Sequence, residues 1–172
     1  MSIEDLGNIG EFLGGIGVVV TLVYLAVQIR QNSRTVKASA AQSVLQSLSE
    51  ALRAAAESPG LTRVIKQGFT EFEKLDETEE WQFFLWLFAW FKLVEQTHQH
   101  YTVGNIEEGT WAGQVAHLKG NLATPAVARF WTARRSAFSQ EFQELVDTLD
   151  LSDRMLAAGE ALAIFRGESP AK

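Results

Sequence analysis

The chain has 172 residues and a formal net charge of -6 at pH 7, and it contains no cysteine. The length allows one domain, with or without an appended segment. The acidic balance argues against a protein that binds the phosphate backbone of nucleic acids. Without cysteine there is no disulfide, no thiolate metal site and no cysteine nucleophile. With only three prolines and no strand-like alternation of apolar and polar residues, the sequence predicts an all-α protein.

The first predicted element is an apolar helix over residues 12–29, where Thr21, Tyr24 and Gln28 are the only polar side chains. A helix of this length rises about 27 Å, close to the roughly 30 Å of hydrocarbon in a bilayer. A core helix of a soluble protein usually keeps a polar face, and this stretch has none. We therefore expect an uncleaved membrane anchor. The alternatives are a helix buried in a soluble assembly and a signal peptide cleaved at the small residues 38–40.

Charged residues on either side of this helix predict its orientation. The residues before it include acids but no lysine or arginine, whereas Arg30, Arg34 and Lys37 follow it. A secretory signal has the reverse order, and basic residues stay on the cytoplasmic side of a membrane. The sequence therefore predicts a membrane protein with its N-terminus outside and residues 30–172 in the cytoplasm. The three basic side chains are expected to contact anionic lipid headgroups.

Small residues form one face of the apolar helix. Gly10, Gly14, Gly17 and Thr21 follow one another at spacings of four, three and four. Such a face lets two membrane helices approach closely. The pattern favours packing against a second copy or another membrane helix, although glycine is also common in membrane spans without any such role.

After the span, apolar periodicity predicts a series of helices. Their expected ranges are about 38–56, 61–73, 76–104, 106–122, 125–137, 139–149 and 152–165. Thr124, Ser139 and Ser152 are expected to cap the last three. The predicted fold is all-α, with a single N-terminal transmembrane helix followed by a compact bundle of five or six helices. The expected domains are an anchor over 1–30, a cytoplasmic helical domain over 31–166 and a flexible tail over 167–172.

The central helix is apolar nearly all round over residues 81–91. That block is too short to span a membrane comfortably, so we interpret it as the core helix of the domain. Alternatively, its aromatic side chains meet a partner chain or the membrane interface, where tryptophan is enriched. The aromatic residues in question are Trp81, Phe84, Trp86 and Trp90.

One pair of residues resembles part of a metal site. Glu95 and His98 form Glu-x-x-His, the spacing that helical di-iron proteins use, but those proteins need a second such pair and further carboxylates. The sequence holds no second pair, and it has none of the common hydrolase or phosphate-binding motifs. We therefore predict no cofactor. Arg134 and Arg135 lie beside Trp131 in the sequence. They could bind an anion, or they could lie on a solvent-exposed helix face and pair with acidic residues.

Two motifs give the chain a family resemblance. The span ends in Gln-x-Arg-Gln-Asn, and a late Trp-x-x-Arg-Arg precedes Phe-Ser-x-Glu-Phe. These positions are Gln28, Arg30, Gln31, Asn32, Trp131, Arg134, Arg135, Phe138, Ser139, Glu141 and Phe142. The chain resembles, to about residue 147, a widespread family of small uncharacterised bacterial proteins. The resemblance implies one N-terminal span and a cytoplasmic helical domain, and it supplies no catalytic residues.

The function expected from these features is that of a non-enzymatic, membrane-anchored protein. It would self-associate or serve as an accessory or scaffold subunit of a membrane complex. Its partners would be membrane lipids and either further copies of the chain or a larger membrane protein complex. The alternatives are a metal-dependent helical enzyme that uses Glu95 and His98, and a lipid or small-molecule sensor whose pocket is walled by the aromatic helix.

Overall fold

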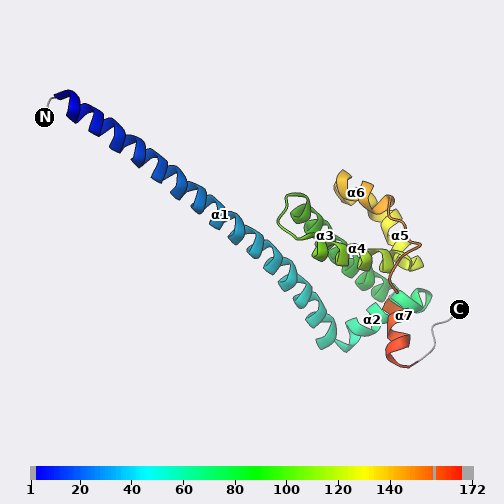
Figure 1. Ribbon diagram of the computed structural model, residues 1–172. Coiled ribbons are helices and arrows are strands. Elements are labelled where there is room, and N and C mark those ends of the chain that lie inside the picture. Colours follow the sequence, from blue (N-terminus) through cyan, green and yellow to red (C-terminus); the bar gives the residue numbers. More distant parts are fainter. Residues whose placement is uncertain (1–2, 157, 168–172) are drawn as a thin grey trace. The chain divides into compact units, whose positions relative to one another are not determined.

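The computed structural model describes residues 3–156 and 158–167, and over these residues every regular element is helical (Figure 1). The α-helices are α1 (Ile3–Glu57), α2 (Pro59–Thr70), α3 (Glu77–Thr102), α4 (Glu108–Leu122), α5 (Pro125–Arg134), α6 (Gln140–Asp147) and α7 (Ala158–Phe165). Short 3-10 turns at Phe72–Lys74 and Arg135–Ala137 complete the regular structure. The all-α prediction is confirmed. Contacts divide the chain into two units, Met1–Ser39 and Ala40–Lys172.

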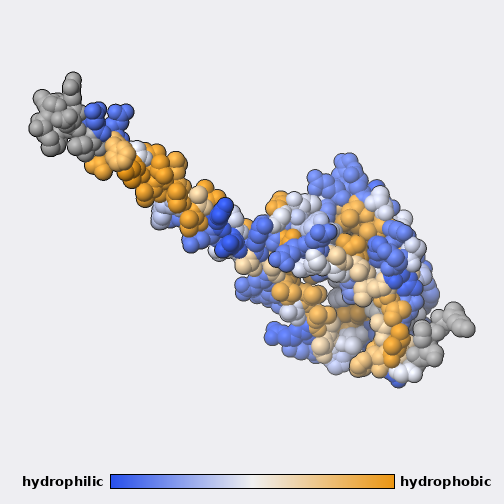
Figure 2. Space-filling model, in the orientation of Figure 1, coloured by the Kyte–Doolittle hydropathy of each residue, from blue (hydrophilic) through white to orange (hydrophobic). Residues whose placement is uncertain are grey.

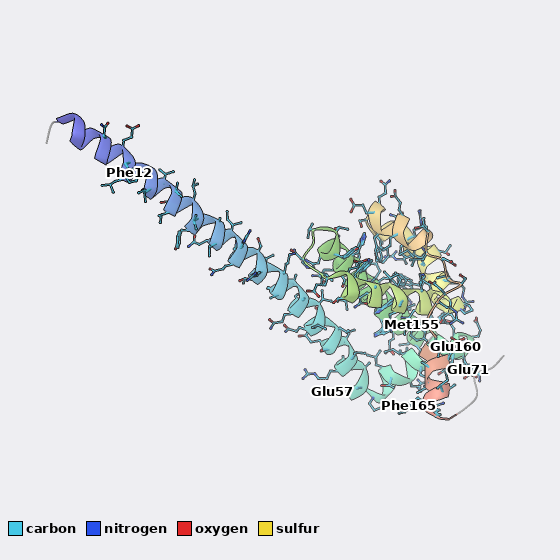
Figure 3. The ribbon with its side chains drawn as sticks, viewed as in Figure 1. Phe12, Glu57, Glu71, Met155, Glu160 and Phe165 are labelled. Atoms are coloured by element: carbon cyan, nitrogen blue, oxygen red, sulfur yellow. The ribbon has the colours of Figure 1, made fainter. Side chains whose placement is uncertain are left out.

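The first unit is the N-terminal part of α1. This helix is unbroken in Figure 1, and Figure 3 labels Phe12 near its start and Glu57 at its end. Every residue from 11 to 39 is exposed, and the apolar side chains make the continuous orange stretch of the helix in Figure 2. Among the described residues, this is the one helix with the length and apolar composition to cross a membrane. The expected boundary at residue 30 falls within the unbroken helix.

Local capping residues account for the start and end of several helices in the second unit. The side chain of Ser58 accepts from the Leu61 amide at 3.3 Å at the start of α2. At the start of α3, the Asp76 side chain accepts from the Glu79 amide at 2.9 Å, and the Glu79 carboxylate accepts from the Asp76 amide at 3.1 Å. This reciprocal pair is a capping box. Gly104, with a φ of 72°, ends α3.

The core of the second unit forms around α3. The Phe91 ring is 0% exposed and lies between aromatic rings of the next helices. Its centroid is 5.3 Å from that of Phe130, 5.4 Å from that of Trp131 and 5.8 Å from that of Phe138. α3 also packs against α2 and α4 (Figure 1). The apolar block of the sequence is therefore covered from several sides by other helices of the same chain.

Asp147 organises the corner between α5 and α6. Its two carboxylate oxygens accept from the Trp131 indole N–H at 2.9 Å and from the Arg135 guanidinium at 2.6 Å. These bonds hold the end of α6 against the end of α5 and the 3-10 turn that follows it. Hydrogen bonds from Arg135 and then from Trp131 lower the pKa of Asp147. Two positions of the late Trp-x-x-Arg-Arg motif thus have a structural role.

The last helix begins later than the sequence predicts. A helix from residue 152 is wrong, because α7 starts at Ala158. The Ser152 amide and hydroxyl both donate to the Asp150 carboxylate at 2.9 Å, which closes a turn and uses the side chain expected to cap the helix. The helix expected over 125–137 also ends at residue 134 and tightens into a 3-10 turn. The predicted tail falls largely on 168–172, outside the described residues.

Gly68 allows α2 to approach α3 closely. A Cβ atom at this position would lie 2.5 Å from ring carbons of Phe83, a side chain that is itself buried in the core. At Gly60, in the first turn of the same helix, a Cβ atom would have nothing within 4 Å. The two glycines of α2 therefore differ in packing although they share a helix.

We predict that Gly68→Ala lowers the free energy of unfolding by about 1–3 kcal/mol, because the added methyl group must displace the Phe83 ring. The matched variant Gly60→Ala should leave stability unchanged or raise it by up to about 1 kcal/mol. Urea unfolding of the full chain followed by circular dichroism measures both values. Equal stability of the two variants would contradict the close packing of α2 on α3.

Candidate functional site

The small-residue face predicted for the apolar helix is open in the single chain. A Cβ atom built at Gly14 or Gly17 would have nothing within 4 Å, and the same holds for Gly15, which lies on another face. The Thr21 hydroxyl donates to the Gly17 carbonyl at 2.8 Å, so its polar group is satisfied within the helix. Gly10 belongs to α1, but its surroundings lie outside the described residues. The face offers space for another helix.

The basic residues after the apolar stretch lie on one side of α1. Arg30, Arg34 and Lys37 are spaced by four and three, which places them on one helical face. All three are exposed, and none forms an ion pair with a described residue. Their charges are therefore available to an external anion.

The four aromatic residues singled out in α3 have different environments. Trp81 is 60% exposed and packs edge-on against Phe84, with ring centroids 5.6 Å apart. Phe84 in turn lies 5.1 Å from the core ring of Phe130. Trp86 is half-buried, and Trp90 is buried. The core and surface interpretations thus apply to different members: Trp90 belongs to the core, whereas Trp81 offers its ring to solvent.

Glu95 joins α3 to the start of α6. The carboxylate is buried, and one oxygen accepts from the Ser139 amide at 2.6 Å while the other accepts from the Lys92 ammonium at 2.8 Å. Lys92 also donates to the Ala137 carbonyl at 2.8 Å. Burial would raise the pKa of Glu95, but the hydrogen bonds from Lys92 and Ser139 outweigh it and lower that pKa. Both oxygens therefore have structural partners.

His98 lies among aromatic rings, next to Glu95 along α3. Its ring centroid is 5.2 Å from that of Trp111 and 6.0 Å from that of Phe142. Burial lowers the pKa of His98, against the raising effect of Glu141 and Glu95. The described residues contain no group of three or more side chains able to hold a metal ion. The structure thus places Glu95 and His98 on one helix, but within the described residues they do not belong to a group of three or more side chains able to hold a metal ion.

The Arg134–Arg135 pair combines two roles. Arg135 is paired with Asp147, as described above. The Arg134 guanidinium lies over the rings of Phe84 and Phe88, at 5.6 Å and 5.4 Å from their centroids. Arg135 therefore forms an ion pair, whereas Arg134 covers aromatic side chains of α3.

The second unit also contains an apolar cavity of about 610 Å³. Its walls come from the C-terminal part of α1, from α2, from α3 and α4, and from Leu162 of α7. Figure 2 shows a hollow here, bordered by hydrophobic side chains. Trp86 and Trp90 contribute to the wall from α3. Helices α1 and α4 supply residues that the sequence did not indicate as parts of a site.

Two polar side chains of α4 line this cavity. Asn121 is 3% exposed and contributes its carboxamide to the cavity wall. His117 lies four residues earlier, on the same face of α4, and packs against Trp90 with centroids 5.9 Å apart. Burial lowers the pKa of His117, so its ring is neutral at pH 7. Neither residue belongs to a recognisable sequence motif, because neighbouring helices create their environment.

Replacement of Glu95 tests its role as a structural link. Glu95→Ala leaves the Ser139 amide and the Lys92 ammonium without their shared partner, so we expect a loss of about 2–4 kcal/mol in unfolding free energy at pH 7. The matched variant Gln96→Ala, on the exposed side of α3, should be close to neutral. Chemical denaturation measures both. An unchanged free energy of unfolding in Glu95→Ala would contradict this structural role.

The same residue predicts a pH dependence. The pKa of Glu95 lies below its ordinary value of 4.5 in the folded chain, so the unfolded chain binds the proton more readily. The contribution of the ionised Glu95 carboxylate to stability is complete above pH 4.5, and it is lost as the pH falls through the lowered pKa of the folded chain. Denaturation of the wild type at a series of pH values should show this loss, and Glu95→Ala should lack that component. Parallel curves of unfolding free energy against pH for the wild type and Glu95→Ala would contradict this pH dependence.

Comparison of the chain with protein-family models, with curated proteins and with solved structures found no match. Two features of the chain bear on its function: the exposed apolar part of α1, and the cavity of the second unit with Asn121 in its wall.

Proposed function

We propose that the chain is a non-enzymatic, membrane-anchored helical protein that self-associates or joins a larger membrane complex as an accessory subunit. The supporting observation is the apolar stretch of α1. Its side chains are exposed on every face, and each Å² of apolar surface costs roughly 25 cal/mol in water. A bilayer removes that cost, and the domain supplies its own core independently of this stretch.

The proposed location is the bacterial inner membrane, with the N-terminus outside and the helices after residue 39 gathered as a bundle in the cytoplasm. The basic face of Arg30, Arg34 and Lys37 supports this orientation, because basic residues remain on the cytoplasmic side. Each such residue contributes about 1 kcal/mol of attraction near an anionic surface. The contact would also fix the depth of the helix in the membrane.

The proposed contact within the bilayer is the small-residue face. Membrane helices associate through close packing, because lipid tails remove the hydrophobic drive that operates in water. Gly14 and Gly17 leave open space on one side of α1, and Thr21 adds no free polar group there. A second copy or another span can therefore approach the backbone on this side.

We expect Gly14→Leu and Gly17→Leu to break the assembly, because a leucine side chain fills the space that a partner helix would occupy. Gly15→Leu is the matched control, since it adds the same volume on a different face. Native mass spectrometry of full chains, released gently from membranes, should show a complex for the wild type and the control but smaller species for the two variants. An unchanged mass for Gly14→Leu and Gly17→Leu would contradict the glycine contact.

The same samples test the anchor itself. The intact chain should remain in the membrane fraction after an alkaline carbonate wash, and its mass should include the apolar stretch. Release into the soluble fraction would contradict anchoring by α1. A mass that begins near residue 40 would instead identify a cleaved signal peptide.

The alternative function, a metal-dependent enzyme that uses Glu95 and His98, is tested directly by measuring bound metal. Protein purified without chelator should carry no stoichiometric iron, manganese or zinc, and EDTA should leave its thermal midpoint unchanged, because both Glu95 oxygens already accept hydrogen bonds. Metal at one equivalent per chain, lost in both Glu95→Ala and His98→Ala, would overturn this expectation and favour the enzyme. Metal analysis and thermal unfolding give the two readouts.

A further inference from the structure

The cavity of the second unit has the size and walls of a small-molecule site. Its volume of about 610 Å³ lies within the range of roughly 300–1,000 Å³ that is typical of ligand pockets. Most of the wall is aliphatic or aromatic, with Leu48 and Leu52 on α1, Ile65 and Phe69 on α2, and Leu93 on α3. These side chains suit an extended hydrocarbon body.

Asn121 points to the polar group of the ligand. Asn121 is 3% exposed and lines the cavity, and no described side-chain nitrogen or oxygen is both fully buried and without a hydrogen-bond partner. Its carboxamide therefore presents polar atoms at the cavity wall, where a ligand can form hydrogen bonds with them. His117 adds a ring N–H on the same face of α4. A ligand that accepts hydrogen bonds would satisfy both side chains.

The charge of the cavity favours an anion. Lys66 is the only charged residue in the described wall, and its ammonium forms no ion pair with a described residue. Among the residues that the structure describes, no aspartate or glutamate lines the cavity to repel a negative group. The head of the ligand is therefore expected to be an acceptor that carries negative charge.

We propose that this cavity binds a long-chain fatty acid, with its hydrocarbon chain along the apolar walls and its carboxylate accepting hydrogen bonds from Asn121 and His117. Lys66 favours the charged acid over a neutral derivative of the same length. This inference is independent of the assembly proposed for the apolar helix: either can fail without the other.

Tryptophan fluorescence gives a direct test, because Trp86 and Trp90 line the cavity. The probe is dibrominated stearic acid, whose bromine atoms quench tryptophan on contact, added to the full chain in phosphatidylcholine nanodiscs. Quenching should saturate for the wild type. Probe that dissolves in the lipid instead of the cavity also quenches some fluorescence, and this background quenching is the same for all variants.

Two alanines of α1 provide a matched pair of variants. Ala51 lines the cavity, whereas Ala54 does not, and both are exposed, so neither substitution repacks the core. We expect Ala51→Phe to weaken the saturable quenching about tenfold or more, a loss of about 1.4 kcal/mol of binding free energy. Ala54→Phe should match the wild type. Equal quenching of the two variants, or quenching that never saturates, would overturn the proposal.

The polar head is tested separately. Asn121→Leu keeps a similar volume, so it should weaken binding of the acid about tenfold without lowering the stability of the unliganded protein. The methyl ester of the probe should bind more weakly than the acid to the wild type, and Lys66→Gln should reduce that difference. Equal affinity for acid and ester would overturn carboxylate recognition. A cavity closed by another segment or a second copy would give no saturable quenching, and that result would also overturn the proposal.

Discussion

The central constraint on the second unit is that α3 is apolar on nearly all sides, so helices from several directions pack against it. A surface helix needs one packed face, whereas this block has several, and only part of it, including Trp81 and Leu85, stays exposed. Phe91 shows the result, because its ring is fully buried and contacts two rings of α5 and the ring of Phe138. Helices α2 and α4 cover other sides of α3. Where this cover is loose, between α1, α2, α3 and α4, the cavity opens.

The polar end of α3 shows why the spacing of two residues is a weak guide to chemistry. Glu95 and His98 match a metal-binding pattern, yet Glu95 bonds to the amide of Ser139, 44 residues later in the chain. That bond, with the one from Lys92, fixes where α6 begins. A local pattern carries no information about such a partner, since the partner comes close only when the fold is complete.

Local signals predicted the helices well and the site poorly, for a physical reason. Ser58, Asp76 and Gly104 act on backbone groups within a few residues, so their effect is readable from sequence. Ser152 has the same chemistry but bonds to Asp150, and the expected helix does not start there. The surroundings of Asn121 and Asp147 are formed by residues from other helices, and no sequence motif indicated either residue.

The two parts of α1 respond to different surroundings although they form one helix. Up to residue 39 every described side chain from position 11 onward is exposed, and over 12–29 nearly all of them are apolar. From Ala40, buried side chains recur four residues apart, at Ala40 and Val44, while most of their neighbours on the other faces are polar or small, apart from the exposed Leu45 and Leu52. That is the pattern of a helix with one packed face in water. The first part has no such face: its apolar side chains lie on every side of the helix, which is the composition of a helix able to cross a membrane.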